Sequence, residues 1–117
     1  MPVWQKAMDL AVKVHAVTST LPKCEDYGLT SQMRRSAVSI SDNIAEGFGR
    51  EHRKDKCMFY IIARGSAQEL KNQHIYGNRV GYFSEQILEQ HKESCEQIVY
   101  ELNLLIKFLR GGSEEKG

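Results

Sequence analysis

The stretch SISDNIAEGFGREHRKDK, residues 39–56, decides the fold, because it either cradles a phosphate or turns a corner between two helices. Gly47 and Gly49 flank Phe48, and a run of charged residues follows them. A dinucleotide-binding loop needs a strand before its glycines, and a P-loop closes on Gly-Lys-Ser or Gly-Lys-Thr. Here the glycines follow a helical pattern, and His52 stands where a third glycine would be. They therefore predict a corner that ends a helix in a left-handed or extended turn.

Apolar residues recur at steps of three and four on both sides of this corner, which is typical of α-helices. No segment alternates with a period of two, as strands require. The four series comprise Val3, Ala7, Leu10, Val14, Val17 and Leu21; Leu29, Met33, Ala37, Ile40 and Ile44; Phe59, Ile62, Ser66, Leu70 and Gln73; and Leu88, His91, Cys95, Ile98, Leu102, Leu105 and Leu109. The sequence predicts an all-α, antiparallel up-down-up-down four-helix bundle with short connections.

The ends of these helices have sequence signals as well. Pro22 is expected to close the first helix, because it cannot donate the backbone hydrogen bond. Thr30 or Ser31 is expected to cap the second helix, and Ser84 the fourth. The segment YGNRVGY, residues 76–82, is expected to interrupt the third.

Length and composition describe one soluble domain, expected at residues 1–110, with a flexible tail at 111–117. The chain has 117 residues, of which 41% are hydrophobic and 26% charged. Its formal net charge of +1 argues against a protein that coats polyanions generally. Cys24, Cys57 and Cys95 form neither a disulfide framework nor a zinc signature, which favours a reducing compartment. No apolar run suits a signal peptide or a membrane span, so we expect a cytoplasmic protein without membrane contact.

No pattern indicates catalysis or a cofactor. A di-iron bundle needs Glu-x-x-His on paired helices, and no histidine here has a carboxylate three residues before it. His91 and Cys95 share a helix face but offer only two ligands, too few for zinc. We interpret them as a histidine and a small thiol of the helix seam. The expectation is therefore no enzyme, no metal and no cofactor.

The fourth helix has more apolar surface than one seam explains. Besides its heptad it carries Ile87, Val99, Tyr100, Leu104, Ile106 and Phe108. One explanation is a broad core-facing stripe with a few exposed residues. The other is an interface with a second subunit, and we favour this oligomer, with Leu104 and Phe108 in the interface.

Two polar or small patterns are open to more than one interpretation. Ser36, Ser39, Asn43 and Glu46 form a line along the second helix, which suits contact with a neighbouring chain, capping of the loop or a solvated face. Gly65 beside Ser66 in mid-helix costs helix stability, so we expect a close approach to the second helix there.

The segments YGLTSQMRRSAVSISDNIAEGFGR and FYIIARGSAQEL, with Trp4 to Ala7 at the start, resemble one family. This family comprises the bacterial four-helix-bundle proteins that are encoded in intervening sequences of 23S rRNA genes. The resemblance extends to about Leu109, and its motif includes Asn43, Glu46, Gly47, Gly49, Gly65 and Ser66. It implies a left-handed antiparallel bundle that forms ring-shaped homopentamers. Lys56 replaces a usual aromatic residue, which is expected to loosen the start of the third helix, and His74 replaces a usual leucine.

Two functional hypotheses remain, and the resemblance bears on the first. A distant relative, the accessory protein of diversity-generating retroelements, binds a reverse transcriptase and nucleic acid. The first hypothesis is thus an oligomeric accessory protein that binds RNA or single-stranded DNA, or a nucleic-acid enzyme such as a reverse transcriptase. Its candidate nucleic-acid-binding residues are Arg34, Arg35, Arg50, Arg53 and Lys54. The alternative is a protein-interaction scaffold without nucleic-acid affinity.

Overall fold

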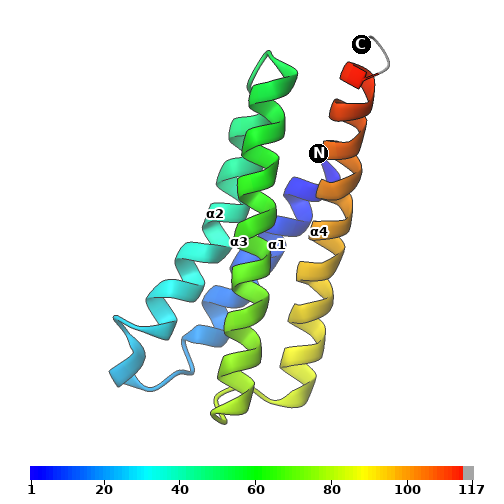
Figure 1. Ribbon diagram of the computed structural model, residues 1–117. Coiled ribbons are helices and arrows are strands. Elements are labelled where there is room, and N and C mark those ends of the chain that lie inside the picture. The colour runs from blue at the N-terminus through cyan, green and yellow to red at the C-terminus, as the bar shows by residue number, and fades with distance from the viewer. Residues whose placement is uncertain (115–117) are drawn as a thin grey trace.

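The computed structural model describes residues 1–114, which form four α-helices, one short 3₁₀ helix and no strand. The elements in chain order are α1 (Pro2–Thr18), η1 (Lys23–Glu25), α2 (Leu29–Phe48), α3 (Arg53–Arg79) and α4 (Glu85–Glu114). In Figure 1, α2 and α4 lie on opposite sides, with α3 in front and α1 behind. α3 packs against both α2 and α4, and so does α1. The expected all-α class is confirmed.

The core is one continuous cluster to which every α-helix contributes about one buried residue per turn, as the 3.6-residue period requires. α1 and α2 contribute Val3, Ala7, Leu10, Val14, Leu29, Met33, Ala37, Ile40 and Ile44, and α3 and α4 contribute Tyr60, Ala63, Ala67, Leu70, Cys95, Ile98, Leu102 and Ile106. Nearly all the predicted positions of α1, α2 and α4 are therefore correct.

The buried stripe of α3 differs from the prediction in its first turns. Tyr60 is buried, whereas Phe59 is only half-buried and Ile62 is 44% exposed. The run Phe59-Tyr60-Ile61-Ile62 is apolar on all sides, so periodicity alone does not choose which residue faces inward.

α3 ends at Arg79, inside the segment expected to interrupt it, so the interruption is confirmed but begins later than Tyr76. Gly77 lies inside the helix and permits contact with Phe83, because a Cβ there would be 2.5 Å from the Phe83 ring. The backbone N–H of Tyr82 then donates to the carbonyl of Gly77 at 2.8 Å. Gly81 has a φ of +89° and turns the chain toward α4.

α1 ends at Thr18, earlier than Pro22 suggested. The Thr18 hydroxyl donates to the carbonyl of Val14 at 2.6 Å, and the Thr20 hydroxyl donates to the carbonyl of Val17 at 2.6 Å. Hydroxyls that bind the preceding turn in this way compete with helix continuation.

The predicted cap of α2 is wrong, while that of α4 is confirmed. The N-cap of α2 is Gly28, and the buried Thr30 hydroxyl has no hydrogen-bond partner among residues 1–114. The Glu25 carboxylate instead accepts from the backbone N–H of Leu29 at 3.2 Å and from the Tyr82 hydroxyl at 2.8 Å. At α4, the Ser84 hydroxyl accepts from the N–H of Ile87 at 3.2 Å.

α4 extends to Glu114, so residues 111–114 of the expected tail are helical, and residues 115–117 lie outside the described range. None of the described helices is both long and apolar enough to cross a membrane. All three cysteines are free, and Cys95 is buried in the core.

Candidate interaction surfaces

The glycine corner between α2 and α3 has ordinary right-handed geometry. Gly47 lies inside α2, and Gly49 follows its end with φ −79° and ψ −8°. Neither has a positive φ, so the predicted left-handed or extended turn is wrong. Gly47 serves packing instead, because a Cβ there would be 2.7 Å from the buried Tyr60 ring.

Lys56 holds this corner together. Its Nζ donates to the carbonyl of Gly47 at 3.2 Å and to that of Phe48 at 2.9 Å. Both are carbonyls in the last turn of α2, where regular helical acceptors run out, and the Gly47 carbonyl also accepts from the N–H of Arg50 at 3.2 Å. The expectation that Lys56 loosens the start of α3 is therefore wrong, since the side chain ties α3 to the end of α2.

Three of the five predicted nucleic-acid-binding residues have partners within the chain. Arg34 donates to Thr18, His15 and Ser19 at 2.9, 3.2 and 3.1 Å, which fixes the end of α1. Arg35 forms an ion pair with Glu69 at 2.9 Å. Arg50 pairs with Glu46 at 3.2 Å and lies 4.8 Å from the centroid of the Phe59 ring.

These arginines also do not form one patch in a single chain. Arg34 and Arg35 lie about 20 Å from the corner along α2, given a rise of about 1.5 Å per residue. The five candidates therefore separate into a group on the first half of α2 and a group at the corner.

Arg53 and Lys54 have a different environment. Within the described residues neither has an ion-pair or hydrogen-bond partner. Together with Arg110 from α4 they border a hollow of about 600 Å³ between the start of α3 and the end of α4. Its other lining residues are apolar or carry a thiol, and none is acidic: Cys57, Met58, Ile61, Ile62 and Leu109. Arg110 was missed because it lies almost sixty residues from the corner in sequence and approaches it only in the fold.

The polar line of α2 faces α3. The Ser36 hydroxyl donates to Glu69 at 3.1 Å, and the Ser39 and Ser66 hydroxyls lie 2.8 Å apart. Asn43 donates to the carbonyl of Ser39 at 2.8 Å. Ser36 and Ser39 thus line the contact between α2 and α3 within one chain, whereas Asn43 bonds within α2 and Glu46 pairs with Arg50.

Gly65 does not support the expected close approach. It is exposed, and no heavy atom lies within 4 Å of the place where its Cβ would be. Ser66, its neighbour, is the residue that lies buried against α2. The prediction from mid-helix glycine is therefore wrong at Gly65.

A histidine pair that sequence reasoning did not find lies in the core between α3 and α4. His74 Nδ1 lies 2.9 Å from the Leu70 carbonyl, and His74 Nε2 lies 2.8 Å from His91 Nδ1. A carbonyl only accepts, so Nδ1 of His74 carries a proton and donates to Leu70, and the unprotonated Nε2 of His74 accepts a hydrogen bond from the Nδ1–H of His91. The signal in the sequence was His74 at a usual leucine position.

Burial determines the protonation of this cluster. It lowers the pKa of His74 to about 4, and it lowers the pKa of His91, to which the charge of Lys13 also contributes. Burial raises the pKa of the Cys95 thiol to about 12, so this thiol stays protonated. No three potential ligands come together in the described residues in a way that could hold a metal ion.

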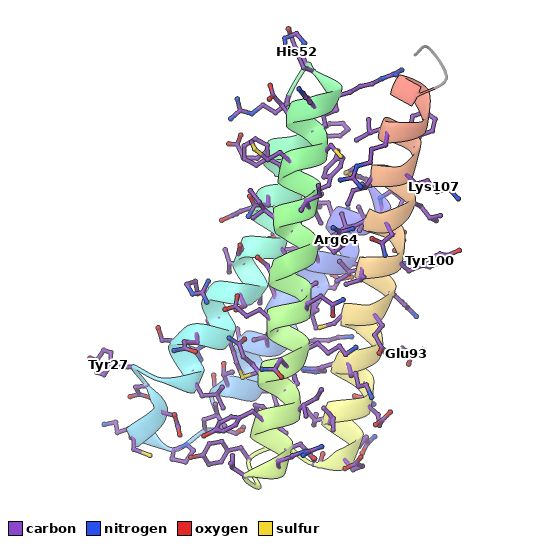
Figure 2. The ribbon with its side chains drawn as sticks, in the orientation of Figure 1. Tyr27, His52, Arg64, Glu93, Tyr100 and Lys107 are labelled. Carbon is purple, nitrogen blue, oxygen red and sulfur yellow. The ribbon has the colours of Figure 1, made fainter. Side chains whose placement is uncertain are left out.

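The surplus apolar residues of α4 divide between core and surface. Ile106 is buried, and Ile87 and Val99 are half-buried. Tyr100, Leu104 and Phe108 are 64, 50 and 73% exposed. In Figure 2 the Tyr100 side chain points away from the bundle. The broad-stripe explanation thus accounts for three residues and leaves an exposed apolar line of three.

Comparisons with known proteins agree with this geometry. The profile of the family described as 23S rRNA-intervening sequence protein matches residues 1–104. A crystal structure from Bacteroides thetaiotaomicron VPI-5482, of a protein with unknown function from the S23 ribosomal protein family, has the same fold, with a TM-score of 0.84. The two chains are 24% identical over 90% of this chain and 98% of that one. No curated protein matches.

Proposed function

Because the chain belongs to the 23S rRNA-intervening sequence protein family, we propose that it is a non-enzymatic, oligomeric accessory protein that associates with nucleic acid in the bacterial cytoplasm. The observation that carries the proposal is the end of the bundle where Arg53, Lys54 and Arg110 border an apolar hollow without an acidic residue. Unpaired cations gathered from two helices suit the phosphates of a nucleic acid, and they release counterions when they bind them.

The oligomer strengthens this surface. A chain of formal net charge +1 has little long-range field, but a ring repeats the same cationic end once per copy. The proposal includes the up-down-up-down helix order and the ring of five copies that the family resemblance implies. Light scattering tests the ring, with an expected mass of five times the 13.4 kDa of one chain.

Binding of fluorescent single-stranded RNA and DNA, measured by anisotropy at low and rising salt, tests the nucleic-acid association. We expect log K to fall with log salt by about 0.7 per neutralised phosphate. The triple variant Arg53→Glu, Lys54→Glu, Arg110→Glu should lose binding while it keeps its helicity.

A matched control makes the same change in net charge at the opposite end of the bundle, with Lys23→Glu, Arg79→Glu and Lys92→Glu. It should keep most of the affinity, because it spares the hollow. Equal losses in both variants, or wild-type protein without salt-sensitive binding, would contradict the assigned surface.

The second candidate is a protein-interaction scaffold without nucleic-acid affinity. The exposed line of Tyr100, Leu104 and Phe108 favours it, because apolar surface of this kind marks contact with another protein. A stable oligomer that retains neither RNA nor DNA at low salt, but recovers a protein partner, would select this function. A nucleic-acid enzyme such as a reverse transcriptase is the partner that the family resemblance implies.

A further inference from the structure

The outer line of α4 consists of exposed residues at steps of three and four: Glu93, Gln97, Tyr100, Leu104 and Phe108. Its most exposed apolar member is Phe108, at 73%. Figure 2 shows that the labelled Glu93, Tyr100 and Lys107 all point away from the other helices. Nothing within the described chain covers this line, so Phe108 is available to insert into a partner.

The outer face of α2 offers a place for such a side chain. Its exposed members are Val38, Asp42, Ala45 and Gly49. Asp42, Ala45, Glu46 and Gly49 line a shallow hollow of about 570 Å³. This hollow exists because Ala45 and Gly49 are small.

Gly49 has no explanation within one chain. Its φ of −79° suits any residue, and a Cβ there would make only ordinary contacts, the nearest at 3.6 Å. A larger residue would therefore cost the folded monomer little. It would, however, fill the hollow on α2.

The two faces carry unpaired residues of opposite charge. The outer line of α4 begins at the acidic Glu93 and ends at Phe108, which has the basic Lys107 beside it. The charge along this line therefore changes from negative to positive. On the outer face of α2, Arg35 and Glu46 are already paired with Glu69 and Arg50, so Asp42 is the acidic residue there that a second copy can meet. Asp42, Glu93 and Lys107 have no ion-pair partner among the described residues.

The fold places these faces where a ring needs them. α2 and α4 lie on opposite sides of the bundle, and in the described chain their backbones are not close neighbours. Both helices also run toward the same end in Figure 1. Rotation about an axis along the bundle preserves direction and height, so it brings α4 of one copy alongside α2 of the next.

From this geometry we propose a heterologous interface in which the outer line of α4 packs on the outer face of α2 of the next copy. Phe108 occupies the hollow at Ala45 and Gly49, and Lys107 meets Asp42. The inference rests on the oligomer of the proposed function and names its contact surfaces. An antiparallel pair of α4 helices would also match charges, but it would place Phe108 opposite Glu93 and leave the α2 hollow empty.

Two variants that each destroy one face test the proposal. Phe108→Glu removes the inserted side chain and keeps the hollow, whereas Ala45→Arg fills the hollow and keeps Phe108. Each variant alone should be a monomer by light scattering, with wild-type helicity by circular dichroism. An equimolar mixture should form a one-to-one pair of twice the chain mass and nothing larger, because only one intact interface can form.

The controls are Tyr76→Glu and Asn72→Arg, which make similar changes at exposed positions of α3, and both should assemble like the wild type. A mixture that remains monomeric, or an Ala45→Arg protein that assembles fully, would overturn the interface. In that case an intact wild-type oligomer shows that the proposed function survives. A monomeric wild-type protein would overturn both.

Discussion

At the scale of single residues, Gly47 and Gly65 are both helical, yet only Gly47 has a neighbour where its side chain would be. A Cβ at Gly47 would lie 2.7 Å from the Tyr60 ring, which is buried and cannot turn away. We expect Gly47→Ala to destabilise the fold by about 1–3 kcal/mol. Gly65→Ala should stabilise it by about 0.5–1 kcal/mol, because the position is open and alanine favours helix. Urea unfolding of both variants checks this, and equal stabilities would contradict the assigned packing of Gly47.

The histidine pair predicts how stability depends on pH. In the unfolded chain histidine titrates near pH 6.5, whereas burial lowers the pKa of His74 to about 4. Between these values the unfolded chain binds a proton that the folded chain does not, so stability should fall as the pH decreases through this window. The expected loss is on the order of 1–3 kcal/mol.

Chemical denaturation from pH 7 to pH 4 measures this loss. The double variant His74→Leu, His91→Leu should lose most of the dependence, and the exposed His52→Gln should keep it. An unchanged dependence in the double variant would assign the acid sensitivity to other groups. The positive charge of Lys13 on α1 adds to burial in lowering the pKa of His91.

At the scale of elements, Glu25 connects two loops that lie at the same end of the bundle. Its carboxylate accepts from the backbone N–H of Leu29 at the start of α2 and from the Tyr82 hydroxyl before α4. The hydrogen bond to this carboxylate raises the pKa of Tyr82 to about 12. Gly28, the N-cap residue of α2, has no side chain that could accept a hydrogen bond, so Glu25 supplies the acceptor.

Glu25→Ala should therefore destabilise the protein by about 1 kcal/mol, as loss of a helix cap does. Tyr82→Phe should destabilise it less, because the Glu25 carboxylate keeps its bond to Leu29. Alkaline absorbance titration gives a second readout, since Glu25→Gln should return the pKa of Tyr82 toward 10. A tyrosine that titrates unchanged would place Tyr82 outside this contact.

The elements also show what sequence reasoning reaches. Periodicity located all four helices and most core positions, because burial on one side of a helix imposes its period on the sequence. It failed at Phe59–Ile62, where every face is apolar, and at the start of α2, where an acceptor from another element replaces a local cap. Of the candidate surfaces, Leu104 and Phe108 were predicted as an oligomer interface, and both are exposed. Arg110, the His74–His91 pair and the α2 hollow depend on contacts between distant segments, which no local pattern encodes.

At the scale of the whole molecule, α1 is the least embedded helix. It has 17 residues against 27 in α3 and 30 in α4, and within the described residues its backbone lies close to α2 and α4 but not to α3. The Arg34 side chain fixes its last turn, and an ion pair of 2.7 Å between Lys6 and Glu101 ties its first half to α4. Local opening with the rest of the bundle intact should therefore begin at α1.

Native-state hydrogen exchange tests this order of opening. Amides of α1 should exchange at lower free energy than those of α3 near Leu70, which open only with global unfolding. Arg34→Ala should lower protection further in the last turn of α1, because it removes the bonds to Thr18, His15 and Ser19. Arg35→Ala is the matched control: its partner Glu69 is on α3, so α1 should exchange as in the wild type. Equal protection of α1 and α3 would mean that the bundle opens as one cooperative unit.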